Sequence, residues 1–474
     1  MARSLFVDFG KCLSHVGIDL GACFSLRHHT RILNSVYKLV TVWGPNIDWI
    51  EISIPVEVMK RLSPHIFQQA EIYNPKYSEG KVSKLRHLGI IGLTGPYFPQ
   101  FSMDMIRSSP KLSELVLEEI PPPRWRIAYF GNPSESQKNV NFLEELSQAN
   151  GITSKLTEFT WTLKNELERD LFFDPLTEQD RAGMAAKLAQ IQFGRLEVLE
   201  LDASVLGKQQ SDLDSLKLVL QANLALQVLR FEPCSQDTPL TIIVGNQDQM
   251  TRQISLNVTL IHLKHLCIDS IKGQAVNLFT TVSHLPNLEV LEVRKRDPNH
   301  FIFYLNQSCF FREQFSLKAA PHTSLKMLAF EYPLEKLQDL HAVFDSFPNL
   351  VEFESPLCFG DRFLFGPIDI IGDVSFMESN WKIHNVLVAF ARKIKNLKIL
   401  RVLNQPELHL VSHWVQAFKV LQKLKGLQEL HIDCRHIKKH LYVGRLRDAV
   451  RNRKVKVLRI RVLPDATSQM ELSY

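Results

Sequence analysis

The chain has 474 residues, 45% of them hydrophobic and 22% charged, which excludes a collagen-like chain, a largely disordered chain and a small disulfide scaffold. Its net charge of +6 conceals an asymmetry, because residues 382–461 carry 20 Lys and Arg against four Asp and Glu. The first 381 residues then have a net charge of −8, which predicts two differently charged surfaces.

The sequence also indicates the compartment. Long uncharged apolar stretches are missing, so we expect no membrane span. Charged residues such as Arg3, Asp8 and Lys11 interrupt the first 25 residues, which argues against a signal peptide. The seven cysteines form no CxxC pair, as is typical of free thiols in a reducing compartment. We therefore expect the protein in the cytoplasm or the nucleus.

The N-terminal segment is the first predicted element. Leu5, Val7 and Phe9 alternate as in a strand, and residues 1–40 are predicted to form a cap or a degenerate first repeat. A weak copy of the pattern described next follows at residues 47–52.

One short pattern then recurs along the chain: an apolar residue, two residues, an apolar residue, one residue and an apolar residue. Its last four positions alternate as in a half-buried strand. The twelve clear copies begin at Leu85, Leu112, Leu156, Leu196, Leu226, Leu263, Leu288, Leu325, Leu350, Leu397, Leu427 and Val455.

Amphipathic stretches separate these predicted strands. Apolar residues at helical spacing occur in 213–222, 274–284, 335–346, 384–394 and 412–424. Strand, turn and helix in repetition predict a curved α/β solenoid of about 12–14 irregular units, with a parallel sheet on its concave face. We expect this solenoid to form one domain over residues 1–463 and to be followed by a short, disordered acidic tail at 464–474.

The pattern resembles the leucine-rich repeat superfamily (ribonuclease-inhibitor-like), whose consensus is LxxLxLxxN/CxL, over roughly residues 40–463. Cys234 and Cys358 match the ninth position in two units, and other residues replace it elsewhere. Long degenerate arrays of this kind are similar to the repeat region of fungal F-box proteins. The resemblance implies an array that binds a target protein and an F-box that docks to a ubiquitin ligase.

The F-box module itself is not matched well. The nearest run is Ile54-Pro55-Val56-Glu57-Val58, but Tyr73-Asn74-Pro75-Lys76-Tyr77 stands where aliphatic helices are expected. We interpret residues 55–72 as an ordinary helix between repeats. The module is then either missing or located upstream of Met1.

Motifs of catalysis and cofactor binding are missing, since the chain contains no GxGxxG, P-loop, GxSxG or HExxH sequence. His436 and His440 have a spacing at which two imidazoles can share a metal, but no further ligands accompany them. We interpret this segment as a solvated basic face. The sequence predicts no catalytic, cofactor-binding or metal-binding residue, and no enzyme.

Candidate partner-binding residues lie between the apolar positions of the strands, where side chains point to the predicted concave face. Acidic residues occupy the early and middle strands and basic residues the late ones, which predicts a bipolar binding surface. Trp125 in the loop 121–139 and Phe363 in the Phe-rich insertion 357–381 are candidate hot spots. The strand candidates are Glu200, Asp202, Glu352, Glu354, Arg401, His431, Arg459 and Arg461.

These features predict a non-catalytic protein-recognition scaffold. The resemblance makes it the target-binding component of an F-box-type ubiquitin ligase, with a cullin-ligase linker protein as a further partner. One alternative is a regulatory scaffold or small-GTPase regulator unrelated to ubiquitin. Another is a binder of an acidic or phosphate-bearing partner through the basic C-terminal repeats. We do not favour nucleic acid or a membrane as a partner.

Overall fold

The computed structural model describes sixteen separate stretches of the chain. These are residues 14–19, 47–53, 84–91, 98–119, 143–163, 185–202, 210–232, 243–244, 255–256, 260–269, 285–294, 321–330, 343–355, 396–405, 426–434 and 457–462. The chain divides into two compact units, residues 1–263 (unit 1) and 264–474 (unit 2). Whether residues 1–463 form a single domain stays a prediction.

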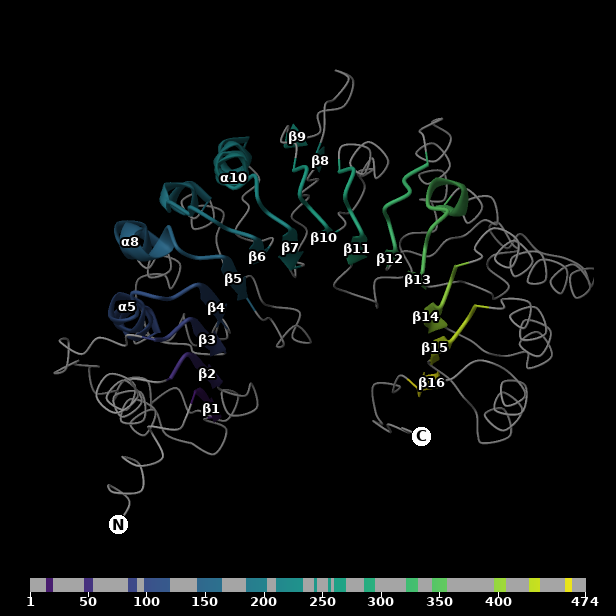
Figure 1. Ribbon diagram of the computed structural model, residues 1–474, viewed down its shortest axis with the longest axis horizontal. Coiled ribbons are helices and arrows are strands. Elements are labelled where there is room, and N and C mark those ends of the chain that lie inside the picture. Colours follow the sequence, from purple (N-terminus) through teal and green to yellow (C-terminus); the bar gives the residue numbers. More distant parts are fainter. Residues whose placement is uncertain are drawn as a thin grey trace, which may run out of the picture. The chain divides into compact units, whose positions relative to one another are not determined.

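Unit 1 contains a parallel sheet whose strands are neighbours in the order of the sequence (Figure 1). Its strands are β1 (His15–Asp19), β2 (Trp49–Ser53), β3 (His87–Ile91), β4 (Glu114–Glu119), β5 (Glu158–Leu163), β6 (Val198–Asp202) and β7 (Val228–Glu232). A separate parallel pair consists of β8 (Ile243–Val244) and β9 (Ser255–Leu256).

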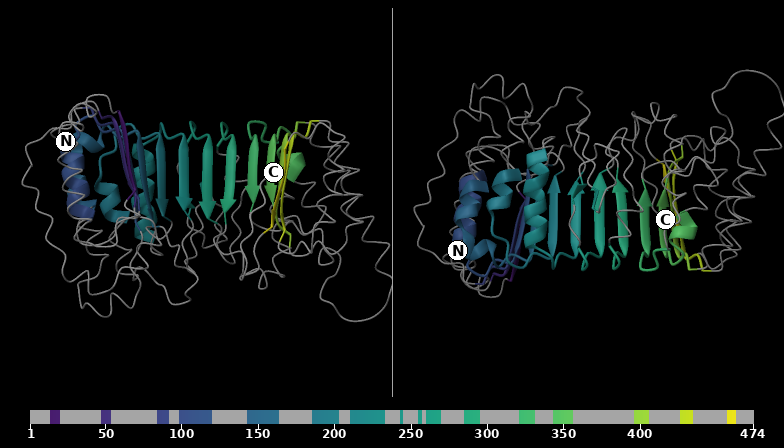
Figure 2. Two further views of the ribbon diagram at one scale, coloured as in Figure 1. Left: turned by 90° about the horizontal axis from the view of Figure 1, so that it is seen from below. Right: turned by 90° about the horizontal axis from the view of Figure 1, so that it is seen from above.

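Unit 2 repeats this arrangement with its own parallel strands, again in sequence order (Figure 2). They are β10 (His265–Asp269), β11 (Val290–Arg294), β12 (Met327–Phe330), β13 (Glu352–Ser355), β14 (Ile399–Gln405), β15 (Glu429–Cys434) and β16 (Val457–Val462). Each of the twelve predicted strand segments is a strand, and the weak copy at 47–52 forms β2.

The apolar pattern forms the core of each unit. In β4, Leu115 and Leu117 are fully buried and pair in register with Leu88 and Ile90 of β3. In the copies from Leu85 to Leu427, the first apolar residue precedes its strand and is also buried, as Leu112 is before β4. Parallel strands that bury the same positions in successive repeats confirm the predicted α/β solenoid in each unit.

Two backbone features repeat at the start of the strands. The N–H of Leu112 donates to the carbonyl of Ser109 at 3.1 Å, and the N–H of Leu288 donates to the carbonyl of Leu285 at 3.0 Å, which closes a tight turn. One carbonyl before most of the described strands then accepts two N–H groups from the next repeat. The carbonyl of Asp48, for example, accepts from Arg86 at 2.8 Å and His87 at 3.0 Å. This ladder satisfies backbone groups at the turns.

Helices cover one face of the sheet in unit 1. Figure 1 shows α5 (Phe98–Ser108), α8 (Asn150–Thr153) and α10 (Gln210–Ala222) on the same side of the strands. Helix α10 confirms the helix predicted at 213–222, and residues 343–346 confirm the end of the one predicted at 335–346. Within the described helices, none is long and apolar enough to span a membrane.

Several predictions lie outside the described residues. They concern Leu5, Val7 and Phe9, the F-box-like run at 54–58, the tail at 464–474, and the helices predicted at 274–284, 384–394 and 412–424. Strand β1 was not predicted, but it pairs with β2 in register from His15 to Asp19.

Candidate functional site

The alternation of the strands creates a second face on each sheet. Buried leucines point to one face, so the residues between them point to the opposite face, which we call the open face of each unit. In β4, Glu114, Val116 and Glu118 alternate with the buried residues and are half-buried. The open faces therefore carry the polar side chains of the strands.

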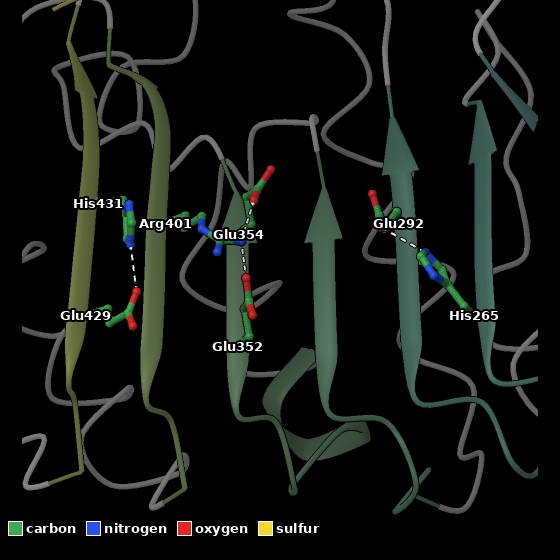
Figure 3. A network of polar contacts seen from close by, with 7 residues as sticks. All are labelled: His265, Glu292, Glu352, Glu354, Arg401, Glu429 and His431. Carbon is green, nitrogen blue, oxygen red and sulfur yellow. Dashed lines mark hydrogen bonds and ion pairs between the residues drawn. The ribbon is translucent and has the colours of Figure 1, made fainter. Parts of the chain in front are cut away.

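An ion-pair cluster occupies the open face of unit 2 (Figure 3). The guanidinium of Arg401 on β14 donates to both carboxylates of the neighbouring strand β13, to Glu352 and, at 3.4 Å, to Glu354. Parallel pairing sets this contact, because Glu354 and Arg401 are register partners. The side chain of Glu354 is only 8% exposed, and the guanidinium of Arg401 helps to compensate its charge.

His431 and Glu429 extend this cluster to β15. The Nε2 atom of His431 lies 3.2 Å from Oε2 of Glu429, and His431 is the register partner of Arg401. Burial is the largest cause that raises the pKa of Glu352. The carboxylates of Glu354 and Glu429 also raise this pKa, whereas Arg401 and His431 lower it. The cluster thus contains three carboxylates around one guanidinium and one imidazole.

A second pair lies on β10 and β11 of the same face. Nε2 of His265 is 2.8 Å from Oε1 of Glu292, and both side chains are mostly buried. Ala329 of β12 is the register partner of Glu292 on one side and of Glu354 on the other. A small apolar side chain therefore separates the His265–Glu292 pair from the Arg401 cluster.

The open face of unit 1 has its own ion pair. Glu200 of β6 and Arg230 of β7 are register partners, and their Oε2 and Nη1 atoms lie 3.8 Å apart. Asp202 is the register partner of Glu232 on the same two strands, but the structure does not describe either side chain.

The predicted site residues are thus brought together in part. Glu352, Glu354 and Arg401 form one cluster, and His431 joins it through Glu429. Glu200 belongs to β6 of unit 1, where its partner is Arg230. Arg459 and Arg461 occupy register positions beside His431 and Asp433, without described side chains. Trp125 and Phe363 lie outside the described residues, as do His436 and His440. The binding role of all of them stays a prediction.

Sequence reasoning missed several members of the open faces. Arg230 and Glu292 stand between two apolar positions of their repeats, so the same rule that selected Glu200 applies to them. His265 and Glu429 stand directly before the central apolar residue of their repeats, so alternation places their side chains on the open face as well. The signal was therefore present, but sequence reasoning did not show which residues meet across strands.

The arrangement is one of paired charges on a broad sheet. Within the described ranges, His, Cys, Asp and Glu side chains form no group of three or more that is arranged to hold a metal ion. Comparison of the chain with protein-family models and with curated proteins finds no match.

Proposed function

We propose that this chain is a non-catalytic scaffold that recognises a partner protein through the open faces of its parallel sheets. One observation carries the proposal: charged side chains on successive strands are held in register beside one another, as Glu352, Glu354, Arg401 and His431 are. Preorganised charges of both signs favour specific encounter with a complementary surface. The packed opposite face keeps the strands in place.

The finer part of the proposal is a role as the target-binding component of an F-box-type ubiquitin ligase in the cytoplasm or nucleus. It rests on the resemblance of the repeat pattern alone, since fold and function are separate inferences. Recovery of a cullin-ligase linker protein with the purified chain supports it. Recovery of a stable partner without such a linker contradicts the ligase role and leaves the recognition role intact.

A pair of charge reversals in unit 2 tests recognition. Glu429 belongs to the open-face cluster and has a side chain that is 37% exposed. Glu289 precedes β11, pairs with Lys326 at 2.7 Å, and is 41% exposed. We expect Glu429→Lys to reduce recovery of the main copurifying partner by about tenfold or more, because reversed charge opposes complementarity across an interface.

Glu289→Lys is the matched control and should leave recovery within about twofold of the parent chain, a change of under 1 kcal/mol. Both variants are first compared with the parent by thermal unfolding, so that a folding defect is not taken for lost binding. Equal recovery with both variants would show that the open face of unit 2 does not select the partner.

A further inference from the structure

A row of aromatic and acidic side chains crosses the open face of unit 1. His15, Trp49, His87, Glu114 and Glu158 stand at the first position of β1 to β5, and each is the register partner of the next. Adjacent members are therefore separated by one strand spacing of about 4.8 Å. Aromatic rings form the first part of the row, and carboxylates form the second.

The rings are stacked and tied to the carboxylates. The ring centroids of Trp49 and His87 are 5.0 Å apart with an interplanar angle of 12°. Nδ1 of His87 lies 2.9 Å from Oε2 of Glu114, so the imidazole links the indole to the acidic part of the row. His15 is tilted against the other side of Trp49, at a centroid distance of 5.9 Å.

Glycine next to this row leaves room for the rings. A Cβ atom on Gly89 would lie 3.2 Å from Nε2 of His87 and 3.2 Å from Cγ of Glu51, so any larger residue would press on both side chains. Gly17 is the other register partner of Glu51, and a Cβ atom there would meet no atom within 4 Å. Because Gly17 and Gly89 have no side chains, the surface beside Trp49 and His87 is recessed there, and Glu51 between the two glycines adds a carboxylate to it.

The charge of this face is one-sided. Among the described open-face side chains of β2 to β7, five carboxylates accompany a single guanidinium, that of Arg230, and they belong to Glu51, Glu114, Glu118, Glu158 and Glu200. Glu114 and Glu158 are register partners, so two like charges stand side by side. Burial raises the pKa of Glu158, and the charge of Glu114 adds to the effect.

We propose that the strip formed by Trp49, His87, Glu114 and Glu158 binds an extended Lys- or Arg-rich segment of a partner protein. The inference rests on the proposed function, because it names the class of partner that the open face of unit 1 recognises. Cationic side chains would relieve the repulsion between the paired carboxylates, and a guanidinium also packs on aromatic rings. Nucleic acid and phosphorylated segments are disfavoured by the same negative charge.

The geometry favours an extended segment. Alternate side chains of an extended peptide lie on one side, about 6.6 Å apart, which long flexible Lys and Arg side chains match to carboxylates on successive strands. On β6 the register partner of Glu158 is Val198, and Glu200 stands two residues further along that strand as the partner of Thr160, so it adds a carboxylate diagonally beyond the row. Several cationic residues of one segment can therefore meet acidic residues in sequence along the face.

Peptide binding to the full chain tests this inference. The probe is a fluorescein-labelled peptide of alternating Ser and Arg, followed by fluorescence anisotropy, and a Ser–Glu peptide of equal length is the reverse-charge probe. We expect the Ser–Arg peptide to bind, with an affinity that falls as salt is added. We expect the double variant Glu114→Gln/Glu158→Gln to weaken binding by about tenfold or more, because two charge-assisted contacts are lost.

Glu145→Gln is the matched control. The Glu145 side chain is 46% exposed, close to the 43% of Glu114, but it pairs with Arg107 of α5 on the helical side of the sheet. It should bind the peptide as the parent chain does. Trp49→Phe should reduce the change in tryptophan emission when unlabelled peptide is added, because one of the six tryptophans then no longer reports on the strip.

Three outcomes would overturn the inference: no binding of the Ser–Arg peptide, equal binding of the Ser–Glu peptide, or equal affinity of Glu114→Gln/Glu158→Gln and Glu145→Gln. The double variant should fold as well as the parent, since it removes a like-charge contact. If the peptide test fails while partner recovery still depends on Glu429, this inference alone is wrong. If both tests fail, the recognition proposal is wrong as well.

Discussion

Two glutamates show how individual side chains respond to the sheet. Glu158 in unit 1 and Glu352 in unit 2 stand at the same position of their strands, directly before the buried central residue. In both, burial is the largest cause that raises the pKa above the ordinary value of 4.5, and a neighbouring carboxylate adds to it. Position in the repeat therefore produces the same electrostatic situation twice.

The sign of this effect on stability follows from proton binding. Because the folded state holds the proton more tightly than the unfolded state, each glutamate favours folding at low pH. That contribution is complete below the unfolded pKa of about 4.5 and is lost as the pH rises through the higher folded pKa. At neutral pH both carboxylates therefore oppose folding.

Glu158→Gln should remove this opposition. We expect the variant to match the parent at pH 4 and to exceed it in unfolding free energy by up to about 1 kcal/mol at pH 7, as is typical when a cross-strand like-charge pair is removed. Urea denaturation at the two pH values measures the difference. Glu145→Gln provides the same change in charge on the helical side. A less stable Glu158→Gln at pH 7 would show that attraction to Arg230 dominates instead.

At the scale of the element, the turn that leads into β6 is under a tight steric restriction. Gly194 lies in the segment before β6, where a Cβ atom would stand 2.6 Å from the carbonyl oxygen of Ser154. That oxygen belongs to the backbone ahead of β5, so it cannot move aside as a flexible side chain does. Glycine at this place lets two successive turns approach each other.

Gly194→Ala should therefore destabilise the protein by about 1–3 kcal/mol, the usual cost of overpacking. The control is Gly151→Ala in α8, where no atom lies within 4 Å of the added methyl group. Alanine there should be neutral or stabilising by up to about 1 kcal/mol, since it favours helix. Thermal unfolding compares the two variants. Equal melting temperatures would contradict the steric explanation.

At the scale of the whole molecule, stability should be distributed along the repeats. Within each unit the inner strands of the sheet are hydrogen-bonded on both sides, as β4 is to β3 and β5, and buried residues of neighbouring strands are register partners. In such arrays, stability is approximately a sum of repeat terms and nearest-neighbour terms. A destabilising substitution in one repeat should therefore lower the stability of that repeat and its immediate neighbours more than that of distant repeats.

Leu115→Ala tests this locality, because Leu115 is fully buried in β4. We expect a loss of about 2–5 kcal/mol in local stability, as is usual for a buried leucine. Hydrogen exchange should become faster in β3, β4 and β5 and should remain close to the parent rate in β14 and β15. A uniform increase along the chain would instead indicate one cooperative structure.

The repeat pattern was sufficient to predict strands β2 to β7 and β10 to β16 and their two faces. Leu115 and Leu117 are buried and Glu114 is half-buried, as alternation requires, because a strand exposes every second residue to the same side. Strand β1 was missed although its segment carries the same spacing, with Leu13 three residues before Val16 and Ile18 two residues after it. Its pairing in register with β2 identifies it as one more copy of the pattern.

The partners across strands follow from the three-dimensional pairing. Glu354 and Arg401 are 47 residues apart, and Trp49 and His87 are 38 apart, so no local pattern connects them. The lengths between strands vary from repeat to repeat, whereas register is set by backbone hydrogen bonds between neighbouring strands. Periodicity thus determines which face of the sheet each residue occupies, whereas only the tertiary pairing of strands determines which residue lies beside it. The second decides the ion pairs, because two charges interact strongly only when they are a few ångströms apart in space, whatever their separation in the sequence.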